Sequence, residues 1–341
     1  MANGTNIIYA PNIRGGGGLV LLRGLLHAAN AATGGRAFLD ERSAPLLPSF
    51  ERISTSWVKP GLAGRLRAER DLAVATSDGD ITLCFSGVPP LLRQRGKVIV
   101  YAQNSLTISN YSLDGFPLRT AARLQVERVL HRLLSGNVDE YVVQTSNMQR
   151  MVQTALIGMQ VQVVPFIVPS NPAQTVERTS DSPLFIYPAH DDPHKNHKNL
   201  IEAWTLLAIE GLFPILALTL EDGNNRLIDP IAGCRGRGGK IRCLGALSHM
   251  QMIEEYRSAT ALVYPSLTES LGLPLVEAQQ VGLPIVASEL DFVRDICDPV
   301  ESFNPYSPIS IARSIKRLLR ITTRRAAPCT PDEAWAKIMR S

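Results

Sequence analysis

The feature that most constrains the fold is an alternation of short apolar runs with longer amphipathic stretches. Parallel strands buried on both faces, joined by crossover helices, give this pattern. The pattern occurs twice, and the two occurrences are separated by PSNPAQTVERTSDSP, which is rich in Pro, Ser and Thr. The sequence therefore predicts two doubly wound α/β domains, at 1–168 and 183–325, joined by a linker at 169–182.

The expected elements can be placed by residue range. In the first half, strands are expected at 6–10, 36–40, 80–85, 97–102, 140–145 and 160–168, helices at 19–30 and 118–134, and a glycine loop at 14–18. In the second half, strands are expected at 184–189, 214–220, 240–245, 261–265 and 284–288, and helices at 199–211, 248–259 and 272–282. Open sheets of this kind bind ligands at the carboxyl ends of their strands, so we expect a site in the cleft between the domains.

Composition narrows the class of protein. Of the 341 residues, 45% are hydrophobic and 19% are charged, which is typical of a globular chain. No apolar run approaches the roughly 18 residues that span a bilayer, and MANGTNIIYA lacks the regions of a signal peptide. The five cysteines are odd in number and show no C-x-x-C spacing. We expect a cytoplasmic protein with reduced thiols and no structural metal.

Positive charge is concentrated in the first half. Residues 1–168 contain 17 Lys and Arg against 11 Asp and Glu, whereas the remainder contains 18 against 20. One interpretation is a solvated basic surface, and the other is attraction to an anionic partner such as a phospholipid surface. Neither a zinc-finger spacing nor an aromatic RNA-binding motif is present, so we expect no nucleic-acid partner.

Two carboxylates flank the start of an expected helix in YPSLTESLGLPLVEAQQVGLPIVAS. Glu269 lies in the loop after a buried strand, and Glu277 lies about one turn into the helix. Free amides and the positive end of the helix dipole make such a start an anion site, to which a diphosphate could bind. Glu277 would then reach vicinal hydroxyls such as those of a ribose. The alternative is that both acids only stabilise the helix dipole.

This segment resembles, nearly position for position, the E-x7-E segment of retaining glycosyltransferases of the GT-B fold. The resemblance implies two Rossmann-like domains that face each other across a cleft, and a terminal helix at 326–341 that crosses back to the first domain. It implies that Glu277 binds the nucleotide ribose and that Glu269 contacts the donor sugar. It further implies that the following backbone amides hold sugar and phosphate: Ser270, Leu271, Gly272 and Leu273.

A second segment, YPAHDDPHKNHKNLIEAW, is similar to the phosphate-binding loop of the same family. Lys195 occupies the position of the catalytic lysine, where it would neutralise charge on the leaving diphosphate. Many relatives carry an arginine five residues earlier, and here that position is His190. The several His and Asp residues of this loop raise a metal site as an alternative. The resemblance implies a metal-independent enzyme without a cofactor.

Weaker candidates come from the loops around the expected cleft. The resemblance places Ala246 and Leu247 beside the nucleotide base, and it places Gly16 and Gly17 against the donor diphosphate or the acceptor. Gln103 and Asn104 follow a strand of the first half and are candidates on the acceptor side. Relatives with a histidine there have a base that these two amides cannot replace. His131, in the middle of an amphipathic helix, is interpreted as structural.

The resemblance implies a retaining hexosyltransferase that moves a sugar from a UDP- or GDP-linked donor to an acceptor hydroxyl in the synthesis of a bacterial-type surface polysaccharide or glycolipid. The partners are then a nucleotide sugar and a glycan or lipid-linked acceptor. A first alternative is an NAD(P)-dependent oxidoreductase, for which RGGGG and Asp40 give an incomplete G-x-G-x-x-G pattern. A second alternative is a catalytically silent GT-B subunit that only binds nucleotide sugar.

The stretch PLRTAARLQVERVLHRLL bears on where such an enzyme works. Apolar residues recur at helical spacing in this order: Leu118, Ala122, Val126, Val129 and Leu133. We expect this apolar face to pack on the sheet and the arginines to face water. The alternative is peripheral attachment of the basic helix, through Arg119 and Arg123, to anionic lipid at the inner face of the membrane.

Overall fold

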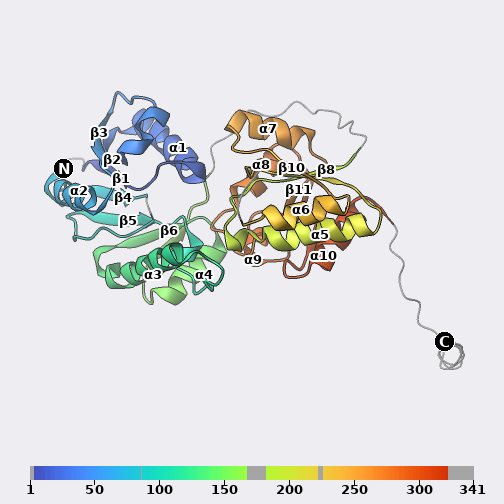
Figure 1. Cartoon of the computed structure of the whole chain (residues 1–341). Helices are drawn as coiled ribbons and strands as arrows, with labels where there is room; N and C mark the ends of the chain where they lie inside the picture. The colour runs from blue at the N-terminus through green and yellow to red at the C-terminus, as the bar shows by residue number, and fades with distance from the viewer. Residues whose placement is uncertain (1–3, 86, 167–181, 222–225, 322–341) are drawn as a thin grey trace, which may run out of the picture.

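The computed structural model describes residues 4–85, 87–166, 182–221 and 226–321. They form two α/β halves that lie side by side, the first containing β1 to β7 and the second β8 to β13 (Figure 1). The predicted linker and the predicted terminal helix fall largely or wholly outside the described residues, so the domain boundaries stay predictions.

All strands of the first sheet are parallel, in the order β3-β2-β1-β4-β5-β6-β7. This order reverses direction at β1, as in Rossmann-like folds. The strands are β1 (Asn6–Ala10), β2 (Gly35–Asp40), β3 (Ile53–Val58), β4 (Ile81–Cys84), β5 (Lys97–Tyr101), β6 (Glu140–Val143) and β7 (Val161–Val163). The sequence did not indicate β3, because ISTSWV carries polar residues typical of an edge strand.

The second sheet repeats this arrangement in the order β10-β9-β8-β11-β12-β13, again with parallel strands. The strands are β8 (Leu184–Tyr187), β9 (Ile215–Leu218), β10 (Lys240–Cys243), β11 (Ala261–Tyr264), β12 (Ile285–Ser288) and β13 (Glu301–Phe303). The central strands β8 and β11 are buried along their whole length, as their apolar sequences predict. The prediction of a doubly wound α/β fold is confirmed for both halves.

Helices cover the sheets on both faces. The first half contains α1 (Gly16–Ala32), α2 (Leu62–Ala75), α3 (Leu118–Leu133) and α4 (Ser146–Ala155). The second half contains α5 (His197–Ile209), α6 (Ile228–Gly236), α7 (His249–Ser258), α8 (Leu273–Gln280), α9 (Asp291–Arg294) and α10 (Pro308–Leu318). None of the helices within the described residues is both long and apolar enough to span a bilayer.

Helix α3 does not pack in the way that its apolar pattern predicts. Its buried residues are Leu124, Arg128 and His131, whereas the expected apolar face is exposed to solvent. Arg128 donates to the carbonyl oxygens of Leu106 and Tyr111, at 2.8 Å in each case. A buried guanidinium is costly without hydrogen-bond acceptors, whereas an apolar side chain can be exposed without any partner. These polar contacts therefore fix which side of the helix is buried. The expectation that the apolar face packs on the sheet is wrong.

The glycine stretch also differs from the expected loop. Helix α1 begins at Gly16, so the glycines form its first turn. Gly16 has a φ of 65°, a left-handed conformation that glycine adopts without strain. A Cβ atom added to Gly17 would lie 2.4 Å from Leu273 of the second half. A glycine at this position therefore allows the two halves to approach each other closely.

Candidate active site

The centre of the candidate site is an ion pair in the second half. The Lys195 Nζ atom lies 2.6 Å from the Glu269 Oε1 atom, although the two residues are far apart in the sequence. Lys195 comes from the loop between β8 and α5, and Glu269 comes from the loop between β11 and α8. Because β8 and β11 are paired in the sheet, their following loops meet at its carboxyl edge. The structure brings these two predicted residues together.

Two tyrosines at the ends of strands position this pair. The Tyr264 hydroxyl donates to Glu269 Oε1 at 3.0 Å, and the Tyr187 hydroxyl donates to the Lys195 carbonyl oxygen at 2.8 Å. The Tyr187 and Ser266 hydroxyls lie 2.8 Å apart. Sequence reasoning missed these residues, although a tyrosine that ends an otherwise apolar strand is a usable signal. They hold the Lys195–Glu269 pair in place.

The charge state of Glu269 follows from two opposing effects. Burial raises its pKa, but the charge and hydrogen bond of Lys195, together with His194 and a hydrogen bond from Ser266, outweigh this effect, so the net pKa lies below the usual glutamate range. Burial also lowers the pKa of the adjacent His194 to about 4, and the neighbouring Lys195 adds to this shift. The site therefore holds a carboxylate, an ammonium and a neutral imidazole near pH 7.

The loop after Glu269 offers backbone donors at the start of α8. Within the described residues, the amides of Ser270, Leu271 and Gly272 have no hydrogen-bond acceptor. Gly272 precedes the helix with a φ of 72°, which glycine allows without strain, and Pro274 follows at the second helical position. Unpaired amides at a helix start can bind an anion.

Glu277 lies further along α8 and has partners from α7. The Tyr256 hydroxyl donates to its Oε2 atom at 2.9 Å, and the His249 Nδ1 atom lies 3.8 Å from its Oε1 atom. Burial raises the pKa of Glu277, and the Tyr256 hydrogen bond and His249 oppose this effect only in part. Sequence reasoning missed both partners, because only the sheet brings α7 and α8 together.

The remaining candidates of the second half lie at different depths. Ala246 is exposed and Leu247 is half-buried, and both precede Ser248, which caps α7. This turn therefore lies next to His249, the neighbour of Glu277.

His190 is exposed, and it forms no hydrogen bond or ion pair with the rest of the described chain. No contact among the described residues joins it to Lys195, so its role stays a prediction.

The first half contributes its loops to the same region. The hydroxyl of Thr268, one residue before Glu269, donates to the Ser105 hydroxyl at 3.2 Å. Ser105 directly follows Asn104. Thr145 donates to the Ser270 carbonyl oxygen at 3.2 Å. Gly17 lies close to Leu273 at the start of α8, and its contact with the donor or acceptor stays a prediction. The two halves meet around the Glu269 loop.

The two predicted acceptor-side amides have local partners. The Gln103 side chain donates to the Phe85 carbonyl oxygen at 2.6 Å, and its Oε1 atom lies near Gly18 of α1. The Asn104 side chain accepts from the Leu106 amide at 3.0 Å and so caps the short 3₁₀ helix η2 (Ser105–Thr107). Asn104 remains exposed. Its capping role competes with substrate binding, which stays a prediction for both residues.

Two other predictions concern histidines and metal. His131 is buried, and its Nδ1 atom lies 3.1 Å from the Tyr141 hydroxyl, so its structural interpretation is supported. In the part of the chain that the structure describes, no group of three or more His, Cys, Asp or Glu side chains could hold a metal ion.

Comparison with known proteins shows which family part of this chain resembles. Residues 169–328 match the family model of the glycosyl transferases group 1. Nearly half of the chain is therefore similar to the group 1 glycosyl transferases. The serotype-specific mannosyltransferase WbdA of Escherichia coli is 25% identical over 171 residues, which are 49% of this chain and 21% of that protein. The O-antigen chain mannosyltransferase B of Escherichia coli is 29% identical over 107 residues, or 31% of this chain and 28% of that protein. The chain thus spans about a fifth to a quarter of the length of these relatives.

Solved structures extend the likeness to both halves. The sucrose-phosphate synthase of Thermosynechococcus elongatus has a TM-score of 0.73 at 17% identity, covering 93% of this chain and 90% of that chain. Anabaena Alr3699/HepE, solved in complex with UDP and glucose, has a TM-score of 0.62 at 14% identity, covering 92% and 90%. The chain therefore has the GT-B fold of these structures.

Proposed function

We propose that this protein transfers a sugar from a UDP- or GDP-linked donor to an acceptor hydroxyl, with retention of the anomeric configuration. The observation that carries the proposal is the Lys195–Glu269 pair, 2.6 Å long, beside the unpaired amides at the start of α8. A cation, free amides and a carboxylate converge at one edge of the sheet. These groups suit a negatively charged leaving group on one side and a sugar on the other.

Each group has a distinct role in donor binding. The amides of Ser270, Leu271, Gly272 and Leu273 and the positive end of the α8 dipole bind the diphosphate. Lys195 neutralises the charge that develops as the donor bond breaks. Glu269 contacts the sugar, and Glu277 accepts hydrogen bonds from the ribose. Because cationic and amide groups serve the diphosphate, we propose that transfer requires no metal ion and no further cofactor.

The transfer step needs no base from the protein. The bond between the anomeric carbon and the phosphate oxygen breaks, and the acceptor oxygen bonds to the same face of that carbon. The released phosphate oxygen takes the proton of the acceptor hydroxyl. Gln103 and Asn104 bind hydroxyls but cannot act as bases, which fits a mechanism in which the leaving group takes the proton.

Donor entry requires the two halves to move apart. The cavity that reaches Glu277 is lined by Val20 and Leu21 of α1 on one side and by His249 and Leu273 on the other. Its volume is about 20 Å³, enough for roughly one water molecule, whereas small-molecule sites measure about 300–1,000 Å³. The close approach of Gly17 to Leu273 closes the same region. We infer that the arrangement described here is a closed one.

The acceptor is proposed from the relatives. Their names describe a serotype-specific mannosyltransferase and an O-antigen chain mannosyltransferase. We therefore propose that the acceptor is a glycan, free or lipid-linked, in the synthesis of a bacterial surface polysaccharide. The protein would act in the cytoplasm at the inner face of the membrane. The exposed apolar side chains of α3, flanked by Arg119 and Arg123, favour contact with an anionic lipid surface.

A donor screen tests the proposal. UDP- and GDP-sugars are offered to the protein, and release of the nucleoside diphosphate is measured with and without glycan acceptors. We expect turnover with one donor class, and Glu269→Gln should reduce it by about 10²–10³-fold while nucleotide affinity changes little. Tight NAD or NADP binding with hydride transfer would instead identify an oxidoreductase. Binding of nucleotide sugar without hydrolysis or transfer would identify a silent binding subunit.

A further inference from the structure

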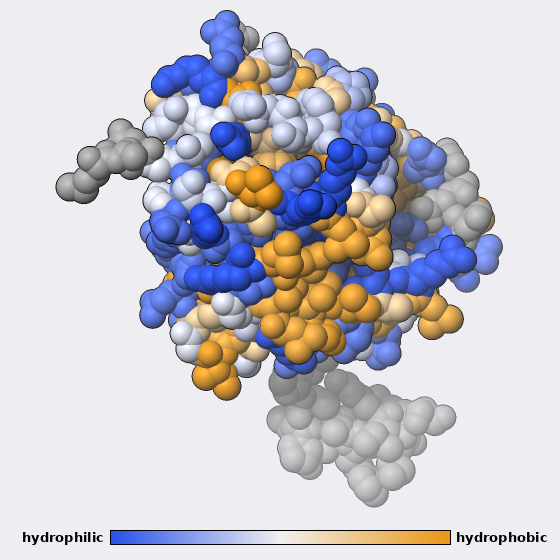
Figure 2. Space-filling model, turned by 90° about the vertical axis from the view of Figure 1, so that its left-hand side faces the viewer, coloured by the Kyte–Doolittle hydropathy of each residue, from blue (hydrophilic) through white to orange (hydrophobic). Residues whose placement is uncertain are grey.

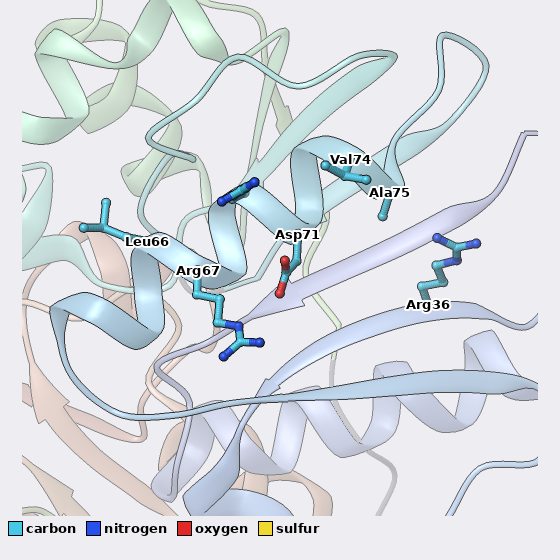
Figure 3. Close-up of a pocket in the computed structure, with 7 residues that line it drawn as sticks. Arg36, Leu66, Arg67, Asp71, Val74 and Ala75 are labelled. Carbon is cyan, nitrogen blue, oxygen red and sulfur yellow. The ribbon is translucent and has the colours of Figure 1, made fainter.

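An open hollow lies beside α2, on the first half of the molecule and outside the candidate active site. It has a volume of about 910 Å³, and Arg36 of β2 and Arg67, Arg70, Leu66 and Val74 of α2 line it. Figure 3 shows Arg67 and Asp71 extending from one side of α2 and Leu66 from the opposite side, with Arg36 beyond the C-terminal end of the helix. The hollow therefore combines basic and apolar walls.

The charges that line this hollow are unbalanced. Arg36, Arg67 and Arg70 are exposed, and none of them forms a hydrogen bond or ion pair with the described residues. Asp71 is the single carboxylate among the lining residues. Most other arginines of this half have partners, for example Arg65 with Glu69 and Arg93 with Asp139. Guanidinium groups form paired hydrogen bonds with phosphate, so an anion with phosphate oxygens suits this lining.

The surroundings of the hollow are apolar. On α2, Leu62 is 74% exposed and Val74 is 82% exposed. Figure 2, which views the molecule from the side of α2 in Figure 1, shows apolar side chains gathered into a patch bordered by hydrophilic ones. A dispersed set of exposed apolar residues needs no explanation, but a patch bordered by polar residues is typical of an interaction site.

Helix α3 extends this surface. His131 of α3 contacts Tyr141, and Tyr141 packs in the same core cluster as Ala68 and Leu72 of α2. The two helices therefore cover the same face of the sheet. The exposed apolar residues of α3 are Leu118, Val126, Val129 and Leu133. We call α2 and α3 with these side chains the α2–α3 face. A face with exposed apolar side chains and unpaired arginines matches the interface of an anionic bilayer.

We propose that the hollow beside α2 binds the phosphate of an anionic phospholipid headgroup when the α2–α3 face lies on a membrane. Leu62, Leu66 and Val74 then enter the headgroup region, and Arg36, Arg67 and Arg70 contact phosphate oxygens. The proposal rests on the proposed function only in its purpose, which is to hold the enzyme beside a lipid-linked acceptor. Its chemistry does not depend on sugar transfer.

Vesicle binding of the full chain tests this proposal. Partition onto phosphatidylglycerol vesicles is measured at low and high salt, with phosphatidylcholine vesicles as the neutral reference. Arg67→Gln and Arg70→Gln should each weaken partition by about fivefold, the effect of one basic residue near the surface. Arg23→Gln is the matched control, because Arg23 is exposed on α1, which packs on the opposite face of the sheet. The three variants should unfold like the original protein.

The outcomes separate the sources of phosphate and the two proposals. Equal losses in all three variants would indicate a general effect of positive charge and overturn the site. Stabilisation by inorganic phosphate, without binding to anionic vesicles at low salt, would also overturn it, as would a dimer that buries the α2–α3 face. Nucleotide affinity should be unchanged in Arg70→Gln. Loss of donor turnover in a protein that still binds vesicles would refute the proposed function and leave this site standing.

Discussion

The two halves of the molecule share one strand order but differ in how their apolar side chains are buried. The second half has one continuous core, which includes Trp204, Tyr256 and Leu262. The first half has its core divided between the two faces of its sheet, with a separate small cluster around Leu124. Most of the exposed large apolar side chains of the described residues also belong to the first half. The second half thus buries most of its apolar side chains around one core, whereas the first half leaves more of them exposed.

The largest effect is expected from breaking the Lys195–Glu269 ion pair of the second half. Lys195→Met should lower the free energy of unfolding by about 3 kcal/mol, because Glu269 would remain charged and largely buried without its partner. Lys198→Met, at an exposed position on α5, should change it by less than about 0.5 kcal/mol. Urea unfolding of both variants measures the difference. Equal effects would mean that the pair contributes no more than surface charge.

The pair should also be sensitive to acid. The pKa of Glu269 is lowered in the folded protein, so the stability from this carboxylate is fully present above its unfolded pKa. That stability is lost as the pH falls through the lowered folded pKa. The difference between the original protein and Lys195→Met should therefore shrink in acid, which urea unfolding over a pH series measures.

The next test concerns Glu277 and the nucleotide. Glu277→Gln should weaken nucleoside diphosphate binding by about 1–3 kcal/mol, because a charged acceptor for the ribose is lost. Glu254→Gln on α7 is exposed and should leave the affinity unchanged. Titration calorimetry with UDP and GDP checks both variants. Unchanged affinity in Glu277→Gln would remove this residue from the site.

The raised pKa of Glu277 gives the same test a pH dependence. As the pH falls, the carboxylate becomes protonated at a higher pH than an ordinary glutamate, so nucleotide affinity should begin to weaken there. The Tyr256 hydrogen bond lowers this pKa, so Tyr256→Phe should move the loss of affinity to still higher pH. A shift in the other direction would contradict the assignment.

A smaller effect is expected from replacing His197, a buried histidine of the second half. The side chain is buried, and among the described residues neither ring nitrogen has a hydrogen-bond partner. His197→Leu should raise the free energy of unfolding by about 1–2 kcal/mol, because an unsatisfied polar group is removed. Thermal and urea unfolding measure the gain, with the exposed His190→Leu as control. Destabilisation would indicate that water or a ligand pairs with His197.

The gain from His197→Leu should grow in acid. Burial lowers the pKa of His197 to about 3, below the unfolded value near 6.5. The unfolded chain therefore binds a proton that the folded chain does not, and the histidine costs stability as the pH falls below about 6.5. Leucine removes this cost, so the two proteins should diverge further at pH 5 than at pH 8.

The smallest effect is expected from a substitution on the exposed side of α3. Leu133→Ser should change the free energy of unfolding by less than about 0.5 kcal/mol, because Leu133 is 75% exposed. Leu124→Ala, on the buried side of the same helix, should cost about 2–5 kcal/mol. Urea unfolding distinguishes the two orientations of α3. A large loss from Leu133→Ser would mean that this surface is covered in solution.

Sequence reasoning succeeded where the signal was local. The apolar strands and the placement of Lys195 and Glu269 in loops that follow strands can be recognised from residues close in the chain. It failed on α3, where two faces of one helix could each be buried. It also missed Tyr187 and Tyr264, whose hydroxyls act on groups supplied by other loops.

The sequence by itself determined the repeating α/β pattern and the residue types of the E-x7-E segment, because backbone propensity and binary patterning act over a few residues. Only the tertiary structure decided that Glu269 meets Lys195, that Tyr256 bonds to Glu277, and that Gly17 closes on Leu273. It also decided which side of α3 faces water. These contacts join segments far apart in the chain, and their free energies depend on burial and on partners that no local pattern specifies.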